Sequence, residues 1–485
     1  MENPIKSITH IFFTISALLI TSAAQELAIG FKTTPNPSVT SFQSVLNDST
    51  GSSSLGFLRV NRTQLALSVV HLPSLEPLWQ TNPTIPSARW SDRTEFFFNG
   101  SLVISDPHSG TFWSTETQGD RVVLLNTSNL QILKHHVTDS SPLVLWQSFD
   151  YPTNTLVENQ NLTSSMALVS SSGIYSLRLG DIFMALYAKF DHNSDQMYWR
   201  HEALEGRTVI IEGDGPLLAR VESDGYLGMF QNKTAPVDIQ SFNSFHRNIS
   251  RFLFVRLELD GNLKGYLWDG SNWVLDYQAI TDTCQLPNPC GSYSLCKPGS
   301  GCSCLDNRTY SGSSGCLSVK SDGDFCSSGE HDGVANDMSV LRRKGVELPY
   351  KKLMSYKTTS SLEECEGFCE NNCSCWGAVY NNGSGFCYFV DYPIQTLLGV
   401  GDESKLGYFK VWEGTGKKKE GVIIGVGIFS GAILILFGAV GFGVYKIWKR
   451  RERAKGIFEE ENGISTGPYK NLGSDSFRSI EMGNR

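Results

Sequence analysis

The first half of this 485-residue chain has no cysteine, because all twelve cysteines lie between Cys284 and Cys387. Disulfides therefore cannot stabilise the region before Cys284. An even number of clustered cysteines is typical of a disulfide framework in an oxidising compartment. Zinc is the alternative, since Cys302-x-Cys304 and Cys373-x-Cys375 are close pairs, but this spacing is unusual for zinc and no histidine lies within the first six cysteines. We predict six disulfides, with no metal and no cofactor.

Catalytic signatures are also missing. The chain contains no kinase glycine loop, no H-R-D or D-F-G run and no G-x-S-x-G elbow. The 40 residues from 446 to 485 follow the last apolar run, and a catalytic domain needs well over ~100 residues. We therefore predict that the protein is not an enzyme and has no catalytic residues.

An excess of basic residues is the third absence. The chain has 41 basic and 49 acidic residues, a formal net charge of −8. Residues 446–485 carry 9 basic and 6 acidic residues, a charge of +3, so the rest sums to −8 − 3 = −11. A polyanion needs a basic face. We therefore predict no nucleic-acid partner.

Two long apolar runs predict the topology. Lys6, the run Ile8 to Ile20, and Ser22-Ala23-Ala24 fit a signal peptide over residues 1–24 that is cleaved before Gln25. The 25 residues from Gly421 to Tyr445 carry no charge and are long enough for one transmembrane helix. Six basic residues follow this run within ten positions, against three before it. The bias predicts a single-pass type I plasma-membrane protein with an extracellular N-terminus and a cytoplasmic tail at 446–485.

The extracellular side contains sites for N-glycosylation. Nine N-x-S/T triplets are predicted glycosylation sites: Asn47, Asn61, Asn99, Asn126, Asn161, Asn232, Asn248, Asn307 and Asn382. A tenth, Asn372, is disfavoured because its middle residue is Cys373.

Residues 25–281 show short strand-like segments punctuated by Gly, Asn, Asp, Ser or Pro, and no sustained helical period. A turn, a strand and a tryptophan-containing strand occur together twice, ending at Trp113 and Trp146, and a later unit ends at Trp268. Such repetition is expected of a threefold prism of short sheets. We predict a mostly β chain with related domains at 25–163 and 164–281.

A family resemblance rests on these residues. The run from Leu145-Trp-Gln-Ser-Phe-Asp to Leu156 resembles the end of the bulb-type lectin domain of plant S-locus glycoproteins and G-type lectin receptor-like proteins. The segment Leu257 to Cys290, with Asp260-Gly-Asn-Leu, is similar to the S-locus glycoprotein segment that follows it. The resemblance extends to the kinase-less subgroup with a PAN domain. It implies tandem bulb-lectin β-prisms, an EGF-like module at 282–317 and an α+β PAN/apple module at 322–413.

The cysteine spacing alone leaves 15 pairings open for the first six residues. The resemblance implies the bonds Cys284–Cys296, Cys290–Cys302 and Cys304–Cys316 in the EGF-like module. In the PAN module it implies Cys365–Cys387, Cys369–Cys375 and Cys326–Cys373. Independently, Ser361 followed by Glu364 predicts a capped helix that carries Cys365 and Cys369 on one face.

The family's mannose motif, Q-x-D-x-N-x-V-x-Y, is degenerate here. One copy falls on Phe97, Asn99, Ser101, Val103 and Ser105. The other falls on Leu125, Thr127, Asn129, Gln131 and Leu133. Only Val103 and Asn129 match the motif, and each lost hydrogen-bonding partner costs about 1–3 kcal/mol. We therefore expect this degenerate sugar site not to bind mannose.

We expect a receptor-like glycoprotein that recognises an extracellular protein or glycan as a co-receptor or decoy beside kinase-bearing relatives. The resemblance implies processes such as pollen recognition or defence. A protein partner, either a receptor-like kinase or a second copy, could pair through Gly427-x3-Gly431 or Ala439-x3-Gly443 in the membrane. The alternatives are a true mannose-type lectin and a structural wall-adhesion protein.

Overall fold

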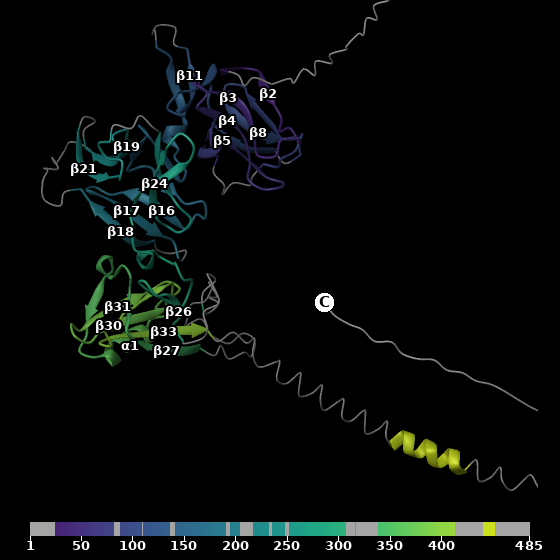
Figure 1. Cartoon of the computed structure of the whole chain (residues 1–485), viewed down its shortest axis with the longest axis vertical. Coiled ribbons are helices and arrows are strands. Elements are labelled where there is room, and N and C mark those ends of the chain that lie inside the picture. The colour runs from purple at the N-terminus through teal and green to yellow at the C-terminus, as the bar shows by residue number, and fades with distance from the viewer. Residues whose placement is uncertain are drawn as a thin grey trace, which may run out of the picture. The chain divides into compact units, whose positions relative to one another are not determined.

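The computed structural model describes residues 25–81, 88–108, 110–135, 141–190, 195–203, 217–231, 235–247, 252–306, 316, 338–412 and 440–451. The chain divides into two compact units, Met1–Trp412 and Glu413–Arg485. The predicted signal peptide, most of the predicted span and nearly all of the predicted tail lie outside the described residues. Residues 440–451 are helical (Figure 1). In the part of the chain that the structure describes, no helix is long and apolar enough to cross a membrane.

The first prism consists of three four-stranded antiparallel sheets, in the orders β1-β10-β11-β12, β2-β7-β8-β9 and β3-β4-β5-β6. Their inward side chains, among them Leu27, Phe57 and Phe96, are fully buried in one core. The strands are β1 (Glu26–Ala28), β2 (Phe31–Thr33), β3 (Phe42–Asn47), β4 (Ser53–Arg59), β5 (Leu65–His71), β6 (Glu76–Gln80), β7 (Glu95–Phe98), β8 (Leu102–Asp106), β9 (Gly110–Ser114), β10 (Arg121–Leu124), β11 (Leu130–Lys134) and β12 (Leu143–Gln147).

The second prism repeats this plan with sheets β13-β22-β23-β24, β14-β19-β20-β21 and β15-β16-β17-β18. In β23, Leu263, Gly265 and Leu267 alternate inward, which is the two-residue period of a half-buried strand. The strands are β13 (Thr155–Val157), β14 (Asn161–Thr163), β15 (Ala167–Val169), β16 (Tyr175–Leu179), β17 (Phe183–Ala188), β18 (Gln196–Glu202), β19 (Leu218–Glu222), β20 (Tyr226–Phe230), β21 (Pro236–Ser241), β22 (Leu253–Leu257), β23 (Leu263–Trp268) and β24 (Trp273–Gln278).

The same irregularity recurs in all six sheets. The register shifts by one residue between the third and the fourth strand of each sheet. A bulge of this kind bends the strand and increases its twist. The recurrence shows that the two prisms are built from one repeated sheet.

The boundary between the prisms lies earlier than the predicted 163/164. Strands β13 and β14 pair with β22 and β19 of the second prism, so the division falls between Gln147 and Thr155. Both strands have only three residues. Strands this short have no alternating pattern of apolar and polar residues that could assign them to the first or the second prism.

The cysteine-rich part contains two further sheets, in the orders β26-β25-β32-β28 and β27-β33-β30-β31-β29. Their strands are β25 (Ser294–Lys297), β26 (Gly301–Cys304), β27 (Met338–Lys344), β28 (Val346–Glu347), β29 (Tyr356–Thr358), β30 (Gly377–Asn381), β31 (Phe386–Val390), β32 (Leu397–Gly399) and β33 (Lys405–Trp412). The described chain as a whole also has three short 3-10 helices. They are η1 (Ser148–Asp150), between the prisms, and η2 (Thr283–Gln285) and η3 (Lys351–Leu353), in the cysteine-rich part.

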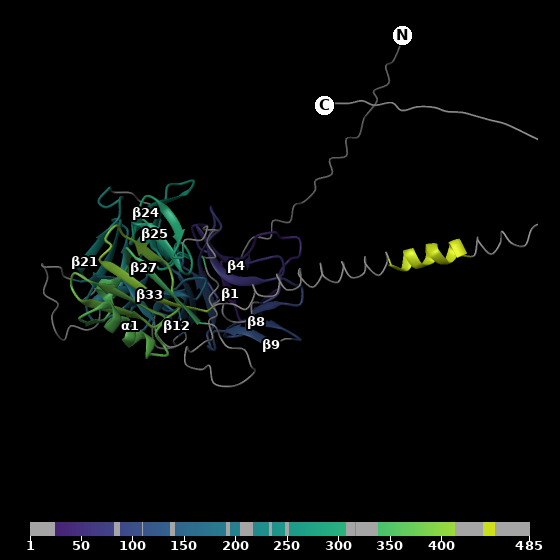
Figure 2. The same cartoon turned by 90° about the horizontal axis from the view of Figure 1, so that it is seen from below.

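The predicted helix is α1 (Leu362–Glu370), next to the five-stranded sheet (Figure 2). The Ser361 hydroxyl accepts a hydrogen bond from the Glu364 amide, as the capping pattern predicts. Cys365 and Cys369 are fully buried against Ala378 and Tyr380 of β30. The sequence therefore predicted both the start of the helix and its buried face.

Five disulfides are described, with the pairs that the resemblance implies: Cys284–Cys296, Cys290–Cys302, Cys304–Cys316, Cys365–Cys387 and Cys369–Cys375. Cys373 is also disulfide-bonded, and Cys326 lies outside the described residues.

One pairing joins the two cysteine-rich modules. Strand β25, from the predicted EGF-like segment, pairs in parallel with β32 of the PAN segment, through Leu295–Leu397 and Cys296–Leu398. The Tyr293 hydroxyl donates to the Lys410 carbonyl at 2.7 Å. These two segments therefore share a sheet, although the sequence predicts separate modules.

Candidate functional site

The first copy of the degenerate motif lies on the β7–β8 hairpin. Val103 is only 7% exposed, so its side chain offers no open apolar surface to a sugar ring. The Ser101 hydroxyl donates to the Thr117 carbonyl at 2.6 Å and accepts from the Thr117 amide at 2.7 Å. Val103 is therefore packed within the prism, and the Ser101 hydroxyl is already hydrogen-bonded to Thr117.

The second copy contains Asn129, whose polar atoms already have partners. Its Nδ2 donates to Gln147 Oε1 at 2.9 Å, and its Oδ1 accepts from the Phe149 amide at 3.3 Å. Asn262 occupies the same place in the second prism and bonds both the amide and the carbonyl of Ile280, at 3.0 and 2.7 Å. In each case the asparagine ties the start of a third strand to the chain that leaves the fourth. This structural role accounts for an asparagine at a position where the sugar motif also has one.

Three tryptophans meet inside the first prism. Trp79, Trp113 and Trp146 each follow the bulge in the fourth strand of one sheet. Their ring centroids are 5.8 to 6.1 Å apart and the planes are steeply inclined, which is the edge-to-face arrangement that aromatic quadrupoles favour. Trp79 and Trp146 are buried, whereas Trp113 is half-buried.

Tyr151 extends this group toward solvent. It directly follows η1 and stacks on Trp146, with 5.6 Å between centroids and 12° between planes. The Trp79 indole N–H donates to the Tyr151 carbonyl at 2.9 Å. Tyr151 is nevertheless 57% exposed. The tyrosine is therefore an ordered aromatic surface that solvent can reach.

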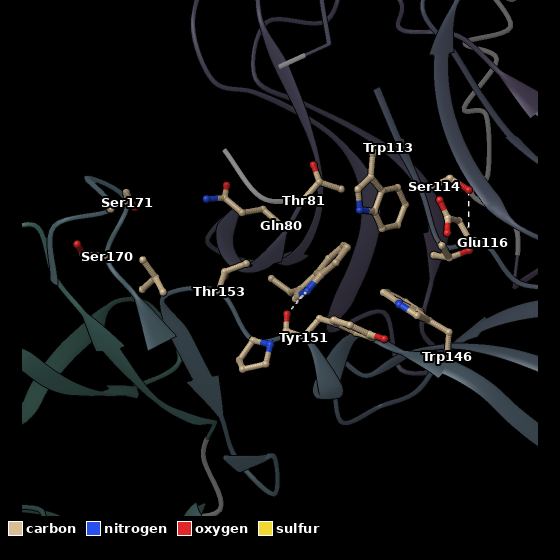
Figure 3. A pocket seen from close by; sticks show the side chains of 15 residues that line it. Gln80, Thr81, Trp113, Ser114, Glu116, Trp146, Tyr151, Thr153, Ser170 and Ser171 are labelled. Carbon is tan, nitrogen blue, oxygen red and sulfur yellow. Dashed lines mark hydrogen bonds between the residues drawn. The ribbon is translucent and has the colours of Figure 1, made fainter. Parts of the chain in front are cut away.

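These four aromatic residues line a cleft of about 430 Å³, which we call the aromatic cleft (Figure 3). A volume of this size suits a small ligand or a few side chains. Glu116 is the one charged residue among the described lining residues, and its backbone has a φ of 52°, in the left-handed region. Thr153 Oγ1 is buried without a hydrogen-bonding partner in the described structure. The other lining residues come from both prisms: Gln80, Thr81, Ser114, Thr115, Pro152, Val169, Ser170, Ser171 and Gly173.

The second prism lacks such a triad among its described residues. The positions after its three bulges hold Trp199, Asp238 and Tyr277. Asp238 pairs with His201 at 2.7 Å, and Gln240 bonds the same imidazole. The repeated fold therefore places one aspartate and two aromatic residues where the first prism has its three tryptophans.

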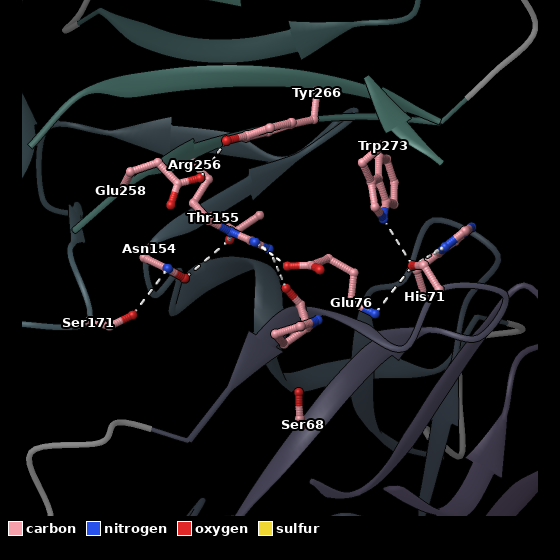
Figure 4. A network of polar contacts seen from close by, with 12 residues as sticks. Ser68, His71, Glu76, Asn154, Thr155, Ser171, Arg256, Glu258, Tyr266 and Trp273 are labelled. Carbon is pink, nitrogen blue, oxygen red and sulfur yellow. Dashed lines mark hydrogen bonds and ion pairs between the residues drawn. The ribbon is translucent and has the colours of Figure 1, made fainter. Parts of the chain in front are cut away.

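The two prisms meet beside the aromatic cleft (Figure 4). Arg256 of β22 forms an ion pair with Glu76 of β6, and its guanidinium also donates to the Pro77 carbonyl at 2.6 Å and to Thr155 Oγ1 at 2.9 Å. The Trp273 indole N–H donates to Ser74 Oγ at 2.9 Å.

His71 lies in the same junction. Its ring is 4.8 Å from that of Trp268 and 5.0 Å from that of Trp273. Burial lowers the pKa of His71, while the charge of Glu76 opposes this shift. The junction thus combines an ion pair with a histidine whose pKa is lowered by burial.

Six of the nine predicted glycosylation sites lie on described residues. Asn61, Asn99, Asn126 and Asn382 are exposed, and Asn47 and Asn161 are half-buried. Asn232, Asn248 and Asn307 lie outside the described residues.

The tryptophan strands are visible in the sequence as a repeat, but the sequence did not predict that they form the aromatic cleft. The recurrence of tryptophan near the end of each turn-strand-strand unit was the available signal. Tyr151 and Glu116 carried no such signal, because their positions depend on how the sheets close.

Comparison with known proteins shows which families this chain resembles. Three family models match the chain: a D-mannose binding lectin at residues 77–178, an S-locus glycoprotein domain at 222–308 and a PAN domain at 339–405. A PAN domain-containing protein of Arabidopsis thaliana is 54% identical over 463 residues, covering 95% of this chain and 92% of the relative. The chain belongs to this family of PAN domain-containing proteins. The lectin match includes every residue that lines the aromatic cleft.

This PAN domain-containing protein has more distant relatives that carry kinases. A G-type lectin S-receptor-like serine/threonine-protein kinase of Arabidopsis thaliana is 26% identical over 377 residues, 72% of this chain, and the chain spans only 42% of that kinase. An EP1-like glycoprotein of the same plant is also 26% identical, over 72% of this chain and 82% of the relative. The chain is thus similar over about three quarters of its length to a receptor-like kinase and to an EP1-like glycoprotein.

Proposed function

We propose that this PAN domain-containing protein is a non-catalytic, single-pass cell-surface glycoprotein that recognises an extracellular protein ligand. It would act as a co-receptor or decoy beside its kinase-bearing relatives, in recognition processes such as defence or pollen recognition. Support comes from its likeness to part of a receptor-like kinase, together with the signal-peptide pattern and the uncharged run at 421–445. The proposal includes an EGF-like module at 282–317, glycans on the nine predicted asparagines and a cytoplasmic tail at 446–485.

The observation that carries the choice of a protein ligand is the internal use of the sugar positions. Val103 is buried, and the hydrogen-bonding atoms of Asn129 are engaged by Gln147 and Phe149. A mannose hydroxyl would have to displace those bonds, each worth about 0.5–1.5 kcal/mol. Mannose recognition remains the second candidate because residues 77–178 match a D-mannose binding lectin model.

Two experiments separate these functions. Crosslinking on intact cells, followed by affinity purification of the full-length protein, should recover a receptor-like kinase or another membrane protein. A glycan array probed with the same purified protein should show no mannose-dependent signal. Strong binding to mannosides with no crosslinked protein would instead establish the lectin alternative.

A further inference from the structure

Neither the disulfides nor the family's sugar positions explain the aromatic cleft. Its floor is formed by the buried Trp79 and Trp146, and its open side by Trp113 and Tyr151. Trp113 contacts the buried Trp79, and Tyr151 stacks on the buried Trp146. Both open rings are therefore held in place before a ligand binds. Such preorganisation reduces the entropic cost of binding.

The electrostatic character of the cleft is one-sided. The face of an aromatic ring carries partial negative charge and attracts a cation within about 6 Å of its centroid. Glu116 adds a full negative charge beside Trp113 (Figure 3), and no lysine, arginine or histidine is among the described lining residues. The part of the chain before residue 446 has a net charge of −11, from −8 − 3. Both the lining and the surrounding protein therefore favour a positively charged group.

The geometry also favours a planar cation. A guanidinium group can stack on an aromatic face and donate hydrogen bonds from its edge. The cleft offers two partly open rings together with the Glu116 carboxylate. Its volume of about 430 Å³ leaves room for the side chain and part of the neighbouring backbone.

We propose that the aromatic cleft binds an arginine side chain of a polypeptide ligand. This inference deepens the proposed recognition function and rests on it for its biological meaning. It places the ligand contact at the junction side of the first prism, away from the β7–β8 and β10–β11 hairpins that hold the degenerate motif.

The test uses full-length protein in detergent and three small probes: N-acetylarginine amide, its neutral isostere N-acetylcitrulline amide, and methyl α-mannoside. Saturation-transfer NMR and tryptophan fluorescence should show saturable binding of the arginine probe and at least about fivefold weaker binding of the citrulline probe. Glu116→Gln should weaken arginine binding about two- to fivefold, and Glu116→Lys should abolish it. Glu26→Gln, an exposed carboxylate on β1 outside the cleft, should have no effect.

Equal binding of arginine and citrulline, or unchanged binding in Glu116→Lys, would overturn the proposal. So would saturable binding of the mannoside alone, or of no probe at all. Tyr151→Ala provides a second variant that preserves the tryptophan core and should also weaken the arginine probe. Crosslinking on cells separates this inference from the proposed function. A partner captured equally by wild type and Glu116→Lys supports the function and rejects the arginine site, whereas no partner in wild type rejects the function.

Discussion

Arg256 and Glu76 form an ion pair that connects the second prism to the first, although 180 positions separate them in the chain. The Arg256 side chain is 12% exposed and that of Glu76 is 31% exposed, so water screens the pair only partly. Because Arg256 also bonds Pro77 and Thr155, it contacts both prisms at once. The orientation of the aromatic cleft walls depends on this junction, since residues from both prisms line the cleft.

Removing this connection should destabilise the junction. We expect Arg256→Met to lower the free energy of unfolding by about 1–3 kcal/mol, because Glu76 and the Pro77 carbonyl lose a charged donor. Thermal unfolding followed by differential scanning calorimetry measures the change. Arg178→Gln, which removes a pair that is 46% exposed at the arginine, is the matched control and should cost less than about 1 kcal/mol. Equal effects of the two substitutions would show that Arg256 has no special role.

The junction should also weaken in acid. Burial gives His71 a lower pKa in the folded protein than its ordinary value of 6.5. The unfolded chain therefore binds the proton more readily, and the stability contributed by neutral His71 is fully present above pH 6.5 and is lost as the pH falls toward the folded pKa. We expect the thermal midpoint to fall between pH 7 and pH 5 by less in His71→Gln than in wild type. The same pH dependence in both proteins would assign the effect to other groups.

Reduction should act on one part of the chain first. The described disulfides all lie after residue 283, so none of them links the strands of either prism. Mild reductant should increase hydrogen exchange in residues 284–306 and 338–412 while the strands of the prisms stay protected. Non-reducing peptide mapping should find six disulfides, with Cys373 bonded to Cys326. Free thiols or bound zinc in unreduced protein would contradict this prediction.

The retained asparagine should matter for folding and not for sugar binding. Asn129→Ala leaves the Phe149 amide and Gln147 without their partner and should cost about 1–3 kcal/mol. Thr127→Ala, at an exposed position of the same motif copy, should be close to neutral. Calorimetry of deglycosylated wild type should show no saturable mannose binding at millimolar sugar, and saturable binding would show that these hairpins still form a sugar site.

Local sequence patterns predicted most of the fold. The short strand-like segments between turn residues and the recurring tryptophan strands predicted β-prisms, and Ser361 with Glu364 predicted α1. The resemblance supplied the cysteine pairs, which spacing left open. The boundary near Thr163 was wrong because the three-residue strands β13 and β14 are assigned only by long-range pairing with β22 and β19.

The candidate site could be predicted less completely from the sequence, because its contacts also join residues that lie far apart in the chain. Asn129 was identified as a motif residue, yet its partners Gln147 and Phe149 lie 18 and 20 positions away and no local pattern connects them. The aromatic cleft needs three sheets to close around one axis before Trp79, Trp113 and Trp146 meet. Sequence shows that such tryptophans recur, and only the closed prism shows that they touch.

The shared sheet of the cysteine-rich part has a consequence for how this architecture can change over generations. Strand β25 lies between β26 and β32, so loss of the PAN segment would leave one side of β25 with unpaired amides and carbonyls. An exposed strand edge promotes aggregation, which selection removes. The two cysteine-rich segments should therefore be inherited as one block, and a gene that gained or lost either alone would encode a protein prone to self-association.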